Sequence, residues 1–141
     1  MNHPHLALRR RHLRFGWSAL FVFATVGAGL EALHAFKVGF YLDLGNETRR
    51  LMWRLGHAHG VLLGLLQIAF AFTLPHTAPG SQRRLQRASA CLLGSGLLLP
   101  LGFLLGGVFS AGGDPGLGVL LVPLGLPLLL AGLWWTARSL H

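Results

Sequence analysis

The chain has 141 residues, of which 52% are hydrophobic and only 11% charged, and its mean hydropathy is +0.56. This composition argues against an ordinary soluble domain and is typical of a membrane protein of single-domain size. The formal charge of +8 does not indicate nucleic-acid binding, because the basic residues gather at the ends of apolar segments, where they set membrane topology. The single cysteine, Cys91, excludes an internal disulfide.

Four apolar runs follow one another along the chain, at residues 15–36, 51–74, 88–110 and 117–137. A helix of about 20 residues crosses a bilayer core about 30 Å thick, so each run is long enough to be a span. Short polar connections make consecutive helices antiparallel neighbours. We therefore predict an all-α integral membrane protein in which residues 1–141 form one antiparallel four-helix bundle.

The first run follows an arginine-rich start and is too long for the apolar part of a cleaved signal peptide, so we interpret it as a span. Nothing breaks its helical pattern between Phe36 and Gly45. We therefore expect this helix to project beyond the membrane through Lys37 and Tyr41, with the turn at residues 43–48.

The second run carries two histidines, His57 and His59, close to its start. At 100° per residue they project about 200° apart on a helix, so they cannot chelate one ion together. They are expected to serve two centres, or one centre and one hydrogen-bond partner. Gly60 and Gly64 share the side of His57, where small residues leave room for another backbone or a flat ligand.

The last two runs carry little chemistry. Gly118, Gly125 and Gly132 recur every seven residues along the fourth run, a pattern that predicts close packing against a neighbouring helix. Pro123 and Pro127 are expected to bend that helix.

Charge distribution predicts the orientation. Eight of the twelve basic residues fall on the side of the termini, whereas all four acidic residues fall on the other side. The positive-inside rule then favours a multi-pass protein of the cell's inner (plasma) membrane with both termini in the cytoplasm.

A polar layer is predicted near the outer surface. Glu31 and His34 are three residues apart on one helix face, and Glu-x-x-His also supplies metal ligands in helical bundles. Glu31 lies about 7.5 Å and His57 about 9 Å inside the outer ends of their spans. Candidate metal ligands are therefore Glu31, His34 and His57, and candidate cofactor ligands are His34, His57 and His59. We expect His34 and His57 to face one another across the first hairpin, with His59 pointing elsewhere.

The sequence GHAHG at residues 56–60, followed by Leu62, Leu63 and Gly64, resembles the His-x-His helix in the catalytic subunit of haem-copper oxidases, particularly those with b-type haem. In that family the first histidine ligates the high-spin haem and the second ligates the low-spin haem from the opposite face. The resemblance implies these two roles for His57 and His59. The family's copper-binding His-His pair has no counterpart in this sequence, so the resemblance does not extend to oxygen reduction.

These observations predict a small polytopic membrane subunit that binds haem b or a transition metal for electron transfer or its assembly. One alternative is a non-enzymatic accessory or packing protein whose polar layer is structural. Another is a membrane enzyme for a lipid-soluble substrate, with Glu31 or a histidine as general base. Gln67, deep in the second run, would suit a proton or substrate pathway. We expect a homo-oligomer or a subunit of a larger membrane complex in the lipid bilayer.

Overall fold

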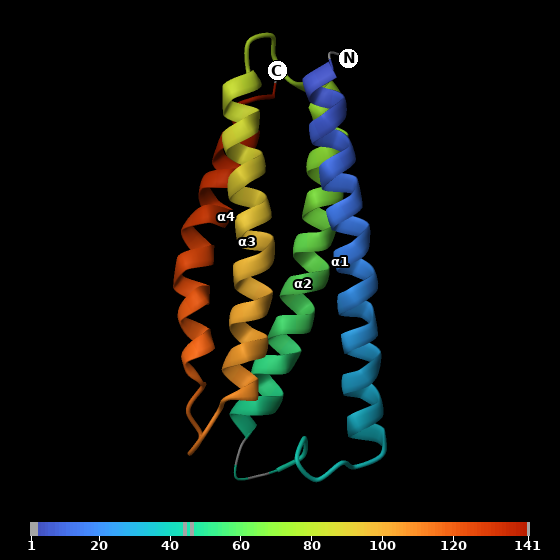
Figure 1. Ribbon diagram of the computed structural model, residues 1–141, viewed down its shortest axis with the longest axis vertical. Coiled ribbons are helices and arrows are strands. Elements are labelled where there is room, and N and C mark those ends of the chain that lie inside the picture. Colours follow the sequence, from blue (N-terminus) through green and yellow to red (C-terminus); the bar gives the residue numbers. More distant parts are fainter. Residues whose placement is uncertain (1–2, 44, 46, 141) are drawn as a thin grey trace.

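The computed structural model describes residues 3–43, 45 and 47–140. Within these residues four long helices run alternately up and down, namely α1 (His3–Ala35), α2 (Glu47–Thr73), α3 (Gln82–Val108) and α4 (Leu121–Ala137), as Figure 1 shows. Short 3-10 turns at Leu74–His76 and Leu117–Leu120 follow α2 and precede α4. The described chain contains no β-strand, and all four helical segments are long and apolar enough to span a membrane. The predicted antiparallel four-helix membrane fold is confirmed.

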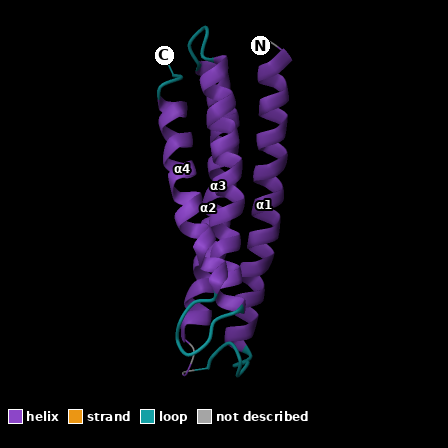
Figure 2. Ribbon diagram, turned by 60° about the vertical axis from the view of Figure 1, so that its left-hand side comes forward, coloured by secondary structure: helices purple, strands orange, loops and turns teal. Residues whose placement is uncertain are grey.

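The helices are arranged in a row, and each packs mainly against its neighbours in sequence (Figures 1 and 2). The central α2 and α3 bury much of their surface, whereas α1 and α4, on the two flanks, do not. Phe21 on α1 is 75% exposed and Leu130 on α4 is 59% exposed. In a bilayer these apolar flanks face lipid chains, which are as apolar as leucine.

Both ends of the chain lie at one end of the bundle, which we call the terminal end, together with the α2–α3 connection (Figure 1). The opposite, distal end carries the α1–α2 and α3–α4 connections. Since α1 has 33 residues, it is about 50 Å long and exceeds a bilayer core of about 30 Å. Its first turns, which carry four arginines, therefore extend beyond the apolar core at the terminal end.

Glycines bring α4, and the 3-10 turn that precedes it, close to α3. A Cβ atom built at each of the three glycines spaced by seven residues would lie within 3 Å of a leucine on α3. The pairs are Gly118 with Leu105, Gly125 with Leu99, and Gly132 with Leu92. The close packing predicted from this spacing is confirmed, and its physical basis is that each leucine occupies the space of an absent side chain.

The helix α1 ends earlier than predicted, at Ala35. The next residue but one, Lys37, has a φ of 52°, in the left-handed region. Its N–H donates to the carbonyl of His34 at 3.1 Å, and the N–H of Val38 donates to the carbonyl of Leu33 at 3.0 Å. These two bonds are those of a Schellman motif, which here ends the helix without a glycine.

The prediction that α1 would continue through Lys37 and Tyr41 is therefore wrong. After the Schellman motif the chain turns back, and Tyr41 is only 3% exposed. Its ring stacks on Trp53 of α2, with centroids 6.2 Å apart, and Phe40 meets the same indole edge-on at 5.9 Å. Burial of Tyr41 and its contact with Trp53 compensate for the helical turns that are not formed.

Candidate cofactor site

A groove of about 980 Å³ opens between α1 and α2 near the distal end. This volume lies at the upper end of the range for small-molecule sites, about 300–1,000 Å³. Aliphatic side chains and glycine form part of its wall, and its polar lining consists of Glu31, His34, Arg50, Arg54 and His57, with the hydroxyl-bearing Tyr41 beside them. All three candidate metal ligands thus line the groove, and His59 does not.

Among the polar groups of the groove, His57 is held by a hydrogen bond across the first hairpin. It is half-buried, and its Nδ1 lies 2.6 Å from the backbone carbonyl oxygen of Phe23 on α1. Since a carbonyl only accepts, Nδ1 is assigned as the donor, and in the neutral ring this leaves the lone pair of Nε2 free. Histidines that ligate metals typically have this arrangement, in which the second nitrogen donates to a carbonyl or carboxylate and fixes the ring.

Gly27 makes this position of the His57 ring possible. A Cβ atom built at Gly27 would lie 2.3 Å from Cε1, 2.7 Å from Nδ1 and 2.9 Å from Nε2 of His57. No side chain fits there, so the imidazole lies directly against the backbone of α1. One turn further along α2, Gly60 accommodates the ring of Phe23 in the same way. The glycine on each helix thus receives a ring from the other.

Glu31 and His34 occupy the α1 side of the groove and are exposed. Neither side chain forms a hydrogen bond or ion pair with another described residue, whereas Arg50 pairs with Glu47 at 3.3 Å. Among the described residues, no three His, Cys, Asp or Glu side chains are close enough together to hold a metal ion. Metal binding by Glu31, His34 and His57 as a set stays a prediction.

His59 faces another helix. Its Nδ1 lies 2.8 Å from the carbonyl oxygen of Leu55 in its own helix, and its ring lies 4.7 Å from the ring of Phe103 on α3. The two histidines of α2 therefore contact different neighbours, as their angular separation requires.

A buried polar network, which we call the His12 network, lies towards the terminal end and was not predicted from the sequence. His12 of α1, Gln67 of α2 and Ser89 of α3 are each 0% exposed. His12 Nδ1 lies 2.5 Å from Gln67 Oε1, and His12 Nε2 lies 2.8 Å from Ser89 Oγ. One side chain from each of three helices therefore meets at a single point.

The His12 network forms one continuous series of hydrogen bonds in which each donor faces an acceptor. Arg11 donates to Ser89 Oγ, which leaves the Ser89 proton for His12 Nε2, and His12 Nδ1–H donates to Gln67 Oε1. Gln67 Nε2 then donates to the carbonyl of Leu92 at 2.7 Å. Every buried group is satisfied, so the network stabilises the packing of three helices and offers no free ligand atom.

One signal for His12 was present in the sequence. His12 precedes Gly16 by four residues, and Gly16 packs against Gly64 and Ile68 of α2. His12 therefore lies on the face of α1 that contacts α2. In the sequence His12 belongs to the arginine-rich start before the first apolar run, whereas in the structure the helix already begins at His3.

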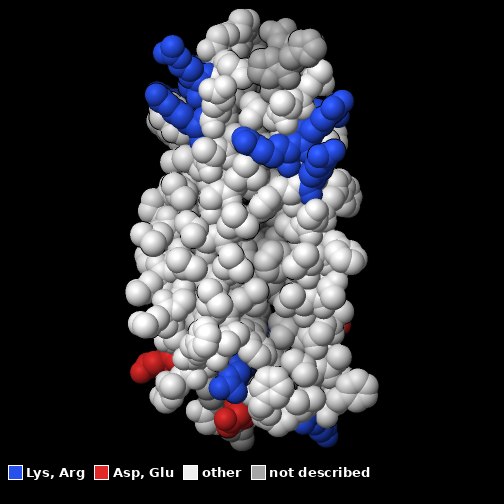
Figure 3. All heavy atoms as spheres, in the orientation of Figure 1, with Lys and Arg blue, Asp and Glu red and all other residues white. Residues whose placement is uncertain are grey.

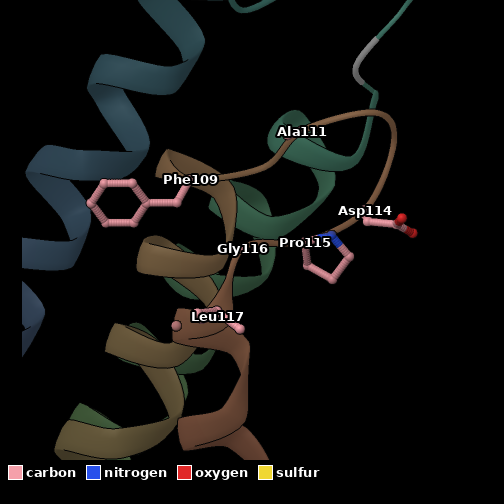
Figure 4. Close-up of a pocket in the computed structure, with 7 residues that line it drawn as sticks. Phe109, Ala111, Asp114, Pro115, Gly116 and Leu117 are labelled. Atoms are coloured by element: carbon pink, nitrogen blue, oxygen red, sulfur yellow. The ribbon is translucent and has the colours of Figure 1, made fainter.

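A second pocket, of about 480 Å³, lies at the turn between α3 and α4 (Figure 4). Asp114 is its only ionisable lining residue, and the apolar Phe109 and Leu117 beside it are 67% and 84% exposed. A single exposed carboxylate suggests no ligand chemistry, so the groove between α1 and α2 is the candidate site.

Comparison of the chain with protein-family models, with curated proteins and with solved structures found no match.

Proposed function

We propose that this multi-pass membrane protein binds haem in the groove between α1 and α2, where His57 would hold the haem iron, and that it acts in electron transfer or its assembly. The observation that carries the proposal is the His57 imidazole, whose Nδ1 is held by the Phe23 carbonyl while Nε2 keeps its lone pair beside a cofactor-sized groove. A ring fixed in this way loses little freedom on binding, and neutral imidazole is a good ligand for haem iron.

The lining of the groove supports haem over a bare metal ion. Haem needs only one or two protein ligands, whereas a structural metal ion in a protein usually takes four, and no cluster of three is found in the described chain. Leu30, Leu55 and Ala58 offer apolar contacts to a macrocycle, and Arg50 and Arg54 offer positive charge to its propionates. His34 lines the same groove and would be the second residue to hold the iron.

The bound haem would supply a one-electron redox couple, and the protein would contribute the ligand, its orientation and an apolar surrounding. The resemblance of residues 56–64 to the His-x-His helix of haem-copper oxidases is in line with this role for His57. His59, which faces Phe103, would be a separate ligand only if a partner helix or a second copy made room beside it.

We also propose that the terminal end faces the cytoplasm across the inner (plasma) membrane. Figure 3 shows Lys and Arg clustered at that end, whereas at the distal end Lys and Arg are mixed with the visible acidic side chains. This is the asymmetry expected from the positive-inside rule. The haem groove would then lie near the outer surface, in a homo-oligomer or a larger complex whose other members receive or deliver the electron.

The test is the absorption spectrum of protein purified from haem-replete cells, in oxidised and reduced forms, with haem and metal content measured beside it. We expect the wild-type protein to show a Soret band. The haem content of the protein should fall at least tenfold in His57→Ala. It should change little in the control His76→Ala, since His76 is exposed in the α2–α3 connection. Glu31→Ala should weaken binding. A colourless wild-type protein, or full haem content in His57→Ala, would refute the proposal.

The structural alternative makes a different prediction from the same variants. If the His57–Phe23 hydrogen bond only fixes the first hairpin, wild-type protein will contain neither haem nor metal, and His57→Ala will lower its stability. The spectrum and the unfolding free energy, measured on the same samples, therefore separate the two functions.

A further inference from the structure

The terminal end carries a large positive charge without an acidic side chain to balance it. All four Asp and Glu residues lie at or near the distal end, where the only salt bridge among the described residues joins Arg50 to Glu47. Figure 3 shows the resulting separation of charge along the bundle. The arginines of the terminal end are Arg9, Arg10, Arg11, Arg14, Arg83, Arg84, Arg87 and Arg138. Their charge must be balanced from outside the described chain.

Three of these arginines are stacked on aromatic rings, and we call them the stacked arginines. The guanidinium carbon of Arg9 lies 5.8 Å from the ring centroid of Phe72, that of Arg87 5.4 Å from Trp135, and that of Arg138 4.5 Å from Trp134. Stacking holds the plane of a guanidinium group but leaves its N–H edge free for an anion.

Within the part of the chain that the structure describes, no partner accepts a hydrogen bond from the stacked arginines. The Nε of Arg9 is shielded from solvent, so an external anion would meet the two terminal amino groups of that guanidinium. Guanidinium groups that are oriented and lack an acceptor suit the oxygen atoms of a phosphate, which arginine binds in bidentate fashion.

The surroundings indicate what carries that phosphate. Phe72 is 57% exposed and Trp134 is 56% exposed, and both lie near the terminal-end tips of membrane helices. An occupant must therefore place an anionic group against the guanidinium and an apolar chain against the exposed ring. A phospholipid has both parts at the required depth, whereas an acidic protein segment lacks the chain.

We propose that the terminal end binds acidic phospholipids and that Arg9, Arg87 and Arg138 hold their phosphate groups. The sites lie on both flanks of the helix row, since Arg9 stacks across α1 and α2 and Arg87 across α3 and α4. Acidic lipids bound there would neutralise the arginines and hold α1 to α2 and α3 to α4 at this level.

The protein is placed in nanodiscs that contain equal amounts of phosphatidylglycerol and phosphatidylcholine with identical acyl chains. It is then released, and native mass spectrometry measures how much of each lipid it retains. Wild-type protein should retain phosphatidylglycerol in at least fivefold excess. The triple variant Arg9→Gln/Arg87→Gln/Arg138→Gln should lose this preference, because one arginine near a membrane surface contributes about 1 kcal/mol, or about fivefold, to binding an anionic lipid.

The matched control removes three terminal-end charges without touching a stacked pair, as Arg10→Gln/Arg14→Gln/Arg83→Gln, since all three arginines are exposed. It should retain most of the preference. Helical circular dichroism and a monodisperse elution profile must be unchanged in both triples, and single variants replace any triple that fails this check. Equal losses in the two triples would overturn the assignment to the stacked arginines, and so would a wild-type protein that retains both lipids equally or prefers a soluble acidic peptide.

Discussion

The contact between Gly27 and His57 makes Gly27→Ala the sharpest test of the first hairpin. The added methyl group would lie 2.3–2.9 Å from three atoms of the imidazole, so it cannot be accommodated unless the ring moves. A ring that moves away from α1 also leaves the Phe23 carbonyl, to which it donates at 2.6 Å.

The magnitude follows from a matched control on the same helix. A Cβ atom built at Gly29 meets no atom within 4 Å, so Gly29→Ala gains the helix propensity of alanine, about 1 kcal/mol, without a clash. That gain is common to both variants and cancels when they are compared. The remainder is a lost hydrogen bond of about 1 kcal/mol and overpacking of about 1–3 kcal/mol. Gly27→Ala should therefore be less stable than Gly29→Ala by about 2–4 kcal/mol.

Reversible unfolding in mixed micelles, followed by circular dichroism or steric trapping, measures this difference. If haem is bound, its content should fall in Gly27→Ala and stay constant in Gly29→Ala, because only the first variant displaces the ligand. Equal stabilities of the two variants would show that the imidazole does not pack against Gly27. The orientation of His57 by the Phe23 carbonyl would then no longer support haem binding.

Three further predictions concern other parts of the molecule. His12→Ala should lower the free energy of unfolding by about 2–4 kcal/mol, because it leaves two buried polar partners unsatisfied and opens a cavity; a loss below about 0.5 kcal/mol would contradict a buried network. Lys37→Gly should raise the stability by about 1 kcal/mol, because φ at this position is 52° and glycine adopts that conformation without steric cost; a lower unfolding free energy would argue against the Schellman motif. After replacement of the native cysteine, single cysteines at Asp43 and His76 should react with an impermeant maleimide from opposite sides of the membrane, and labelling of both from one side would contradict the four-span topology.

The spans could be predicted from the sequence because a helix needs about 20 apolar residues to cross a bilayer core, and each apolar run is at least that long. The spacing of seven residues between Gly118, Gly125 and Gly132 likewise predicted a close contact between helices, since residues at that spacing recur on one helix face. The end of α1 was not predicted, because the Schellman motif at Lys37 depends on a left-handed residue that is usually glycine and here is not.

Parts of the candidate site could not be predicted from the sequence. Periodicity places His57 and His59 on different sides of α2, and the small Gly60 and Gly64 beside His57 led us to expect α1 on that side. The sequence does not name the residue of α1 that receives the ring, nor the neighbour of His59. Only the packed structure decides that His57 lies against Gly27 and lines the groove with His34, while His59 lies against Phe103. The burial of His12 was decided in the same way, since a histidine in an arginine-rich segment becomes a core residue only when Gln67 and Ser89 arrive from two other helices with matching donors and acceptors. Such partners are distant in sequence, and no local pattern records which helices will meet.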